Sequence, residues 1–151
     1  MTADQTQTTE KYDKPLPIIH PDSKPYWDSL KAHEMKMQKC LDCGTVRYPV
    51  SPVCYKCFSG RYEWAKLSGR GKVSAWIVMV RATRNPAWDK DVPYNVALVD
   101  LDEGPRLTTN IVQVKNEEIY KGMVVEIFYD DVTPEVTLAK FKPVATGRQL
   151  R

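Results

Sequence analysis

The second half of the chain has the hydrophobic pattern of a β-protein. Runs of β-branched and aromatic residues are separated by turn-forming sequences such as Asp102-Glu103-Gly104-Pro105 and Lys121-Gly122. This pattern predicts five strands, at residues 72–83, 94–101, 106–114, 123–129 and 136–143. One helical turn fits between the third and the fourth strand. Five strands with a short helix at this place are typical of the partly open, five-stranded OB barrel.

Residues 22–39 have the hydrophobic spacing of a helix, with Pro25 in the first turn, where the missing N–H costs nothing. Tyr26, Trp27 and Leu30 begin an aromatic and aliphatic stripe along one face. This stripe either packs on the protein's own core or contacts another chain. Because so small a segment has little core of its own to cover, we expect Tyr26, Trp27 and Leu30 to lie at an interface with a partner.

The beginning of the chain is polar and rich in threonine, and it continues into a proline-rich stretch. Residues 1–14 show no hydrophobic periodicity, and the prolines that follow exclude a helix interior. We expect a disordered or extended lead over residues 1–21 and a short tail over residues 146–151. No segment resembles a signal peptide or the run of about 18 apolar residues that a membrane span needs. We therefore expect a cytoplasmic protein that does not cross a membrane.

All four cysteines lie in one short segment, in two pairs with the pattern Cys-x-x-Cys. Two residues between thiolates allow one tight turn to present both sulfurs to a single ion, and two such turns close a tetrahedral site. Because cytosolic thiols are kept reduced, paired cysteines favour a metal over disulfides. The sequence predicts one structural zinc ion held by Cys40, Cys43, Cys54 and Cys57.

The cysteine pattern leaves the identity of the metal open and argues against the other interpretations. Spacing alone leaves the metal open between zinc and iron, because four thiolates suit both ions. A thioredoxin-like redox pair needs a single Cys-x-x-Cys in a βαβ setting, which the flanking sequence lacks. His20 and His33 offer nitrogen ligands, but with four sulfurs present we expect both side chains to be solvated or packed. Since four thiolates leave no open coordination position, a catalytic metal is not expected.

The charge balance argues against a nucleic-acid-binding protein. The chain has 22 basic and 19 acidic residues, a net charge of +3, and residues 71–151 carry eleven of each sign. A neutral barrel lacks the positive groove that phosphate binding requires. Single-stranded nucleic acid remains an alternative ligand, because zinc ribbons and OB barrels both bind it. The best basic and aromatic patch, Arg81, Arg84, Trp88 and Lys90, flanks the first long loop of the predicted barrel.

The sequence gives no indication of a catalyst. All four cysteines are assigned to the metal, and the chain has no Gly-x-Ser-x-Gly, His-Glu-x-x-His or glycine-rich phosphate-loop motif. Asp100, Asp102 and Glu103 lie at the end of a predicted strand, where acidic residues commonly begin a turn. We therefore expect no enzyme activity from the chain on its own.

Four elements of the sequence occur in an order that is more specific than the cysteine pairs alone. They are Pro25-Tyr26-Trp27-Asp28-Ser29-Leu30, then Cys40-x-x-Cys43-Gly44 with Cys54-x-x-Cys57, then Ser68-Gly69-x-Gly71-x-Val73, and finally Pro93-Tyr94-Asn95-Val96-Ala97-Leu98-Val99-Asp100. In this order the chain resembles the zinc-ribbon and OB-fold family whose members accompany thiolases and related acyl-CoA enzymes. The resemblance covers roughly residues 15–145.

This resemblance implies a mainly β protein with an N-terminal helix, in which a rubredoxin-like zinc ribbon precedes a five-stranded OB-fold barrel. We expect the extended lead over residues 1–21, the helix over 22–39, the zinc ribbon over 40–67, the OB-fold domain over 68–145 and the tail over 146–151.

The resemblance also implies a non-catalytic auxiliary subunit of a thiolase-like complex, needed for assembly. The helix and ribbon would dock on an acyl-CoA-handling partner, and the barrel would shape or cover the route of the CoA thioester. The patch of Arg81, Arg84, Trp88 and Lys90 is then expected to face CoA. The remaining alternative is a free-standing acyl-CoA binder.

Overall fold

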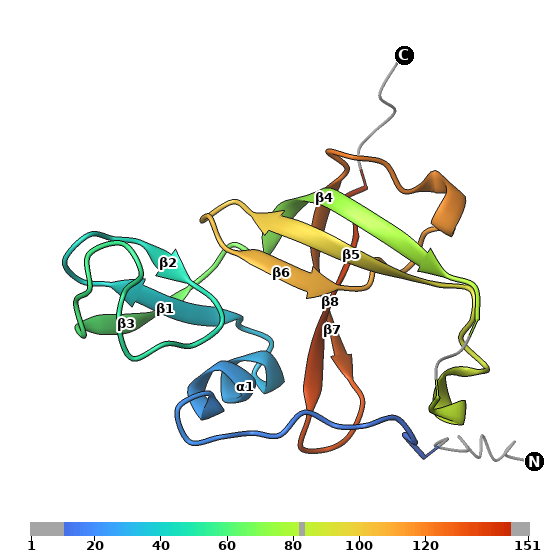
Figure 1. Cartoon of the computed structure of the whole chain (residues 1–151), viewed down its shortest axis with the longest axis horizontal. Coiled ribbons are helices and arrows are strands. Elements are labelled where there is room, and N and C mark those ends of the chain that lie inside the picture. The colour runs from blue at the N-terminus through green and yellow to red at the C-terminus, as the bar shows by residue number, and fades with distance from the viewer. Residues whose placement is uncertain (1–10, 82–83, 146–151) are drawn as a thin grey trace, which may run out of the picture.

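The computed structural model describes residues 11–81 and 84–145 of the chain. In order, its elements are α1 (Lys24–Lys31), β1 (Lys36–Cys40), β2 (Val46–Arg47), β3 (Tyr62–Lys66), β4 (Arg70–Met79), η1 (Pro86–Trp88), β5 (Tyr94–Leu101), β6 (Arg106–Thr109), η2 (Asn116–Glu118), β7 (Val124–Asp131) and β8 (Thr137–Pro143). They form a three-stranded sheet, β2-β1-β3, and a five-stranded sheet, β6-β5-β4-β7-β8 (Figure 1). The predicted mainly β class, with one α-helix and a ribbon before an OB barrel, is confirmed.

The five-stranded sheet curls until its two ends meet. Neighbouring strands are antiparallel, and a parallel bridge between Ile111 and Phe141 joins the chain after β6 to β8. Two backbone hydrogen bonds reinforce this junction, from Val112 N to Phe141 O at 2.7 Å and from Phe141 N to Asn110 O at 3.0 Å. The third strand therefore ends at Thr109, before the predicted Val114, because the following residues turn away to close the barrel.

The barrel core follows from strand alternation. In β5, the buried residues are Asn95, Ala97, Val99 and Leu101, with less buried residues between them. Phe141 of β8 is fully buried among the aliphatic side chains of the other strands. Gly71 allows β4 to approach β5 closely, since a Cβ there would lie 2.5 Å from the carbonyl oxygen of Asp100.

The predicted helix over residues 22–39 is wrong in its extent. Helix α1 ends at Lys31, and His33 follows with φ of 55°, in the left-handed region that stops a helix. Beyond it, Met35 and Met37 are both buried, and Lys36–Cys40 forms the central strand of the ribbon sheet. The spacing from Leu30 to Met37 fits a helical face, so the period-two signal of this short strand was hidden within the helical pattern.

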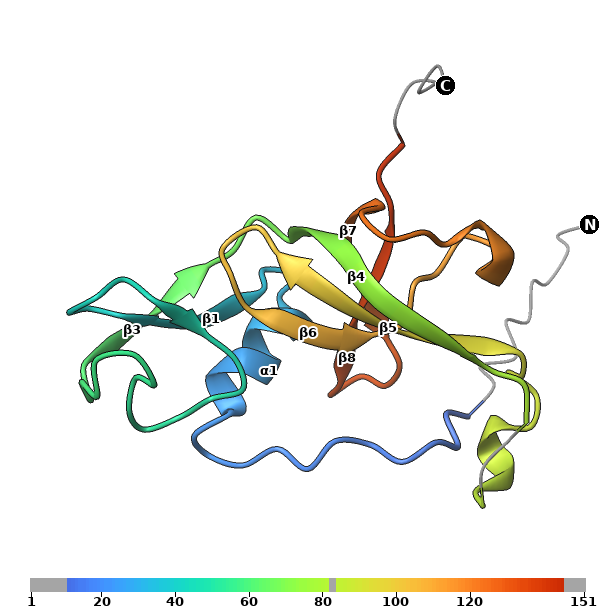
Figure 2. The same cartoon turned by 45° about the horizontal axis from the view of Figure 1, so that its top comes forward.

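The described part of the predicted lead, residues 11–21, contains neither helix nor strand and passes the β7–β8 hairpin on its way to α1 (Figure 2). Residues 1–10 and the predicted tail, residues 146–151, lie outside the described residues. Among the residues described, none of the helices has the length and apolar character that crossing a membrane requires.

Candidate metal centre and neighbouring surfaces

The four cysteines converge from two turns of the ribbon. Their sulfur atoms all lie within 4.8 Å of one another. The sulfurs of Cys40 and Cys57 are 3.6 Å apart, as are those of Cys43 and Cys54. A tetrahedral zinc ion with Zn–S bonds of about 2.3 Å requires sulfur separations of about 3.8 Å. The thiolates therefore fit one zinc ion, with Cys40 and Cys54 buried and Cys43 and Cys57 exposed.

The two cysteine turns have the same backbone design. In the first, Gly44 N donates to Cys40 O at 3.0 Å; in the second, Phe58 N donates to Cys54 O at 2.9 Å. Gly44 and Phe58 both have positive φ, 74° and 60°. Glycine adopts this conformation freely, whereas a phenylalanine there is unusual and costs conformational energy. Phe58 is nevertheless 78% exposed, so burial of its ring within this chain does not explain its presence.

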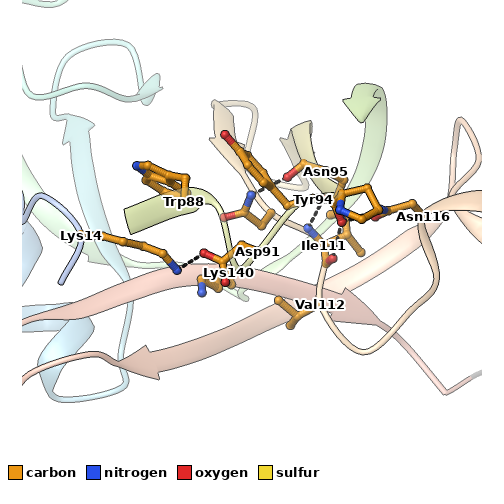
Figure 3. Close-up of a pocket in the computed structure, with 11 residues that line it drawn as sticks. Lys14, Trp88, Asp91, Tyr94, Asn95, Ile111, Val112, Asn116 and Lys140 are labelled. Carbon is orange, nitrogen blue, oxygen red and sulfur yellow. Dashed lines mark hydrogen bonds and ion pairs between the residues drawn. The ribbon is translucent and has the colours of Figure 1, made fainter. Parts of the chain in front are cut away.

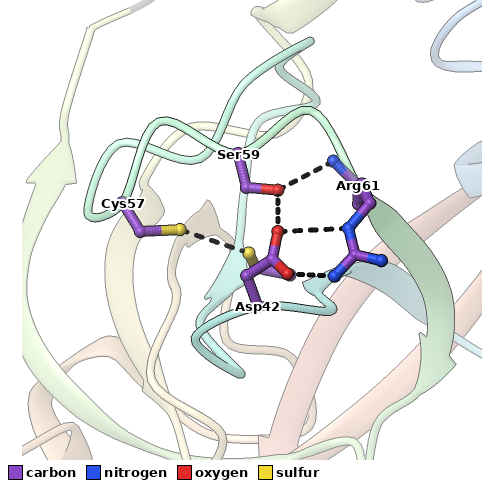
Figure 4. A network of polar contacts seen from close by, with 5 residues as sticks. Asp42, Cys57, Ser59 and Arg61 are labelled. Carbon is purple, nitrogen blue, oxygen red and sulfur yellow. Dashed lines mark hydrogen bonds and ion pairs between the residues drawn. The ribbon is translucent and has the colours of Figure 1, made fainter.

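A polar network outside the cysteines ties the two turns together (Figure 4). The carboxylate of Asp42, between the first two cysteines, accepts hydrogen bonds from the hydroxyl of Ser59 and from the guanidinium of Arg61, whose Nε lies 3.3 Å away. Ser59 Oγ in turn accepts from Arg61 N at 3.0 Å. The hydrogen bonds from Arg61 and, to a smaller extent, from Ser59 lower the pKa of Asp42 to about 2. Sequence reasoning missed this network, because only the fold brings Asp42 to β3.

The predicted partner contacts of α1 are largely wrong. Tyr26 and Leu30 are 4% and 0% exposed, and both belong to the protein's own core. Helix α1 packs against β1, β7 and β8, so the stripe covers the junction between ribbon and barrel. Trp27 is half-buried against the same core and meets Tyr26 edge to face at 5.3 Å. Of the three residues, only Trp27 keeps part of its surface for a partner.

Exposed apolar side chains lie beside the cysteines instead. Leu41 follows Cys40, Tyr55 follows Cys54, and Phe58 follows Cys57; their exposed fractions are 52%, 67% and 78%. Because each of these residues is next to a cysteine and the four sulfurs converge, all three lie close to the metal site. We call this set, together with Val53, the knuckle patch. The sequence already contained a signal for this patch, because a short metal-binding turn has too little chain around it to bury its apolar residues.

The predicted basic and aromatic patch lies on the loop between β4 and β5. Arg81, Arg84 and Lys90 are exposed, and Lys90 forms an ion pair with Asp13 at 3.5 Å. Trp88 is half-buried at the end of η1, with its ring 5.4 Å from that of Tyr94. All four residues belong to this one loop, but only Trp88 among them lines the neighbouring cavity.

That cavity, of about 260 Å³, lies between this loop and the barrel (Figure 3). Lys14 enters it from the N-terminal segment, forms an ion pair with Asp91 and lies 5.0 Å from the centre of the Trp88 ring. On the barrel side, the side chain of Asn95 donates to Ile111 O at 2.8 Å and to Asn116 Oδ1 at 3.0 Å. These bonds hold the β5 end of the cavity in place.

Comparison with known proteins gives the class of this chain. The family model for the rubredoxin-like zinc ribbon domain of ChsH2 matches residues 27–63, and that for the C-terminal OB-fold domain of ChsH2 matches residues 64–129. A DUF35 domain-containing scaffold protein of Methanocaldococcus jannaschii is 37% identical over 113 residues, which cover 70% of this chain and 79% of the relative. The chain belongs to the DUF35 family of zinc-ribbon and OB-fold proteins, and the predicted zinc cofactor and family are confirmed.

Longer relatives and a solved structure agree. A probable enoyl-CoA hydratase alpha subunit of Thermomonospora curvata is 35% identical over 140 residues, or 93% of this chain. The chain spans only 43% of that relative's length. The structure described as the Ltp2-ChsH2(DUF35) aldolase is similar with a TM-score of 0.75 and 35% identity, covering 85% of this chain and 98% of the matched one.

Proposed function

We propose that the chain is a non-catalytic, zinc-binding auxiliary subunit of a complex with an acyl-CoA enzyme of the thiolase-like class, needed for assembly of that complex. The names of the relatives support this class of partner: a hydratase alpha subunit, a scaffold protein and an aldolase. The four-thiolate site has no open coordination position, which supports a structural role for the metal.

The knuckle patch is the observation that carries the proposal. Aromatic side chains are enriched in protein interfaces, and exposed apolar clusters of this kind commonly mark an interaction site. Phe58 adopts a conformation that favours glycine, yet it presents a large apolar ring to solvent. Contact between this ring and a partner explains why an exposed phenylalanine occupies a position that favours glycine. Tyr55 and Phe58, rather than Tyr26 and Leu30, are then the interface anchors.

The test is capture of the partner from native cells with the tagged full-length chain, followed by identification by mass spectrometry and assay of the complex. We expect an acyl-CoA enzyme subunit that loses activity or solubility without this chain. Phe58→Asp should reduce the amount captured by about tenfold or more, because anchors near an interface centre dominate binding. Aspartate is tolerated at positive φ, so the turn should keep its zinc.

Ile18→Asp is the matched control, because Ile18 is also 78% exposed but lies on the N-terminal segment. It should capture the partner as the wild type does, and both variants should contain one zinc ion per chain. A partner that is fully active alone would contradict the proposal. So would capture of single-stranded DNA at physiological salt without an acyl-CoA enzyme.

The finer proposal is that the barrel shapes the CoA-thioester site of the complex through Arg81, Arg84, Trp88 and Lys90. The basic side chains suit the phosphates of CoA, and Trp88 offers a ring face beside them. Calorimetry with CoA separates the alternatives. Binding by the complex but not by the isolated chain is expected; equal binding by the isolated chain would favour a free-standing acyl-CoA binder.

A further inference from the structure

Strand β4 has a neighbour on both sides only at its beginning. Residues 70–72 pair with β7. On the same side, Val73 is hydrogen-bonded to the chain just before β7: Val73 N donates to Met123 O at 3.0 Å, and Gly122 N donates to Val73 O at 2.7 Å. A bulge follows between Val73 and Ala75. From Ala75 to Met79 the strand pairs with β5, and no other described strand pairs with its second side.

Figures 1 and 2 show this end of β4 extending together with β5 beyond the rest of the barrel. Half of the backbone N–H and C=O groups of such a strand point away from its single neighbour. We call residues 75–80 the β4 edge. It offers a row of backbone donors and acceptors to any added strand.

The side chains of the β4 edge are apolar on both faces. Ile77 and Val80 are 60% and 71% exposed, and Val78, on the face opposite Ile77, is 37% exposed. From Val73 to Val80 the sequence contains no charged residue and no proline. Proteins usually protect an exposed edge with lysine, proline or a bulge within it. The β4 edge lacks these devices after the bulge at its start, so its composition favours strand addition.

The charged residues at the two ends of the β4 edge indicate which kind of strand would bind there. Lys72 precedes it, and Arg81 and Arg84 follow it; all three are exposed. A second copy pairing antiparallel over residues 75–80 would bring Arg81 of each chain close to Lys72 of the other, which places like charges together. A strand with an apolar centre and acidic ends would instead meet opposite charges at both ends.

We propose that the β4 edge receives, by strand addition, an extended segment of the partner subunit that is apolar in the middle and carries Asp or Glu at both ends. This inference rests on the proposed function for the existence of a partner, but it concerns a surface separate from the knuckle patch. The added strand extends the sheet through backbone hydrogen bonds, and its side chains pack beside the apolar side chains of both faces, which removes part of their surface from water.

Hydrogen exchange of the isolated chain and of the chain in its captured complex tests this directly. We expect the outward-facing amides of residues 75–80 to exchange at least about tenfold more slowly in the complex. Amides of β5 that already bond to β4 should change little. Fast exchange at the β4 edge in a complex that has formed would overturn the inference while leaving the proposed function intact. Failure to capture any acyl-CoA enzyme subunit would instead overturn both.

Substitutions at and near the β4 edge provide a second test. Ile77→Lys places a charge in the middle of an exposed edge and should weaken the complex about tenfold or more. Ile18→Lys, at an exposed apolar position elsewhere, is the control and should have no effect. Arg84→Glu should weaken the complex severalfold, and an acidic-to-lysine change at the matching end of the partner segment should restore it. Equal binding by Ile77→Lys, or protection of the edge in a dimer of the chain alone, would overturn the inference.

Discussion

At the scale of single residues, the metal centre depends on more than its ligands. Cys43 and Cys57 are exposed, so the surrounding protein packs less closely around this half of the site. Asp42 compensates by joining the first turn to Ser59, which follows the second turn, and to Arg61, which immediately precedes β3. Groups that orient metal ligands in this way hold the site in its binding geometry.

Asp42→Asn should therefore release zinc faster. Asparagine keeps the size of the side chain but loses the charge-assisted bonds to Arg61. We expect transfer of zinc to a chromogenic chelator to be about tenfold faster than in the wild type. Asp28→Asn is the control, because Asp28 forms a surface ion pair with Lys24 on α1, away from the cysteines. Equal release rates for all three proteins would show that the network does not support the site.

At the scale of elements, α1 joins the ribbon to the barrel. Its buried face reaches β7 and β8, and the chain just after it is fixed to β7 as well. Met35 N donates to the hydroxyl of Tyr129 at 2.9 Å, and the His33 ring stacks on the Tyr129 ring at 4.8 Å. His33 Nε2 also lies 3.0 Å from the carboxylate of Asp131. The helix is therefore a structural link between the two sheets.

Leu30→Ala tests this assignment. Leu30 is fully buried, so truncation should lower the free energy of unfolding of the isolated chain by about 2–5 kcal/mol. Leu16→Ala, at a position 45% exposed, should change it by less than about 0.5 kcal/mol. Urea denaturation of the zinc-loaded proteins measures both. A Leu30→Ala chain of normal stability that fails only to capture its partner would restore Leu30 as an interface residue.

At the scale of the whole molecule, features set by local sequence were predicted, whereas features set by contacts between distant segments were not. The strand over residues 94–101 was predicted at its observed bounds, because alternation and the flanking turns are local signals. The metal ligands were predicted for the same reason, since each cysteine pair sits within one turn. The burial of Tyr26 and Leu30 was not predicted, because it depends on β7 and β8, about a hundred residues further along the chain. Asp42 and the β4 edge likewise depend on which strands become neighbours.

The two sheets should also respond differently to loss of zinc. The barrel supplies most of the shared core, including Val73, Val99, Val125 and Phe141, whereas the three ribbon strands contribute few large buried side chains. In a ribbon of this size, metal binding supplies much of the folding free energy. Excess chelator should therefore release one zinc ion per chain and abolish the dispersed amide signals of β1–β3, while most signals of β4–β8 persist. Restoring zinc should recover them. Loss of all signals in one step would show that the barrel cannot stay folded without the ribbon.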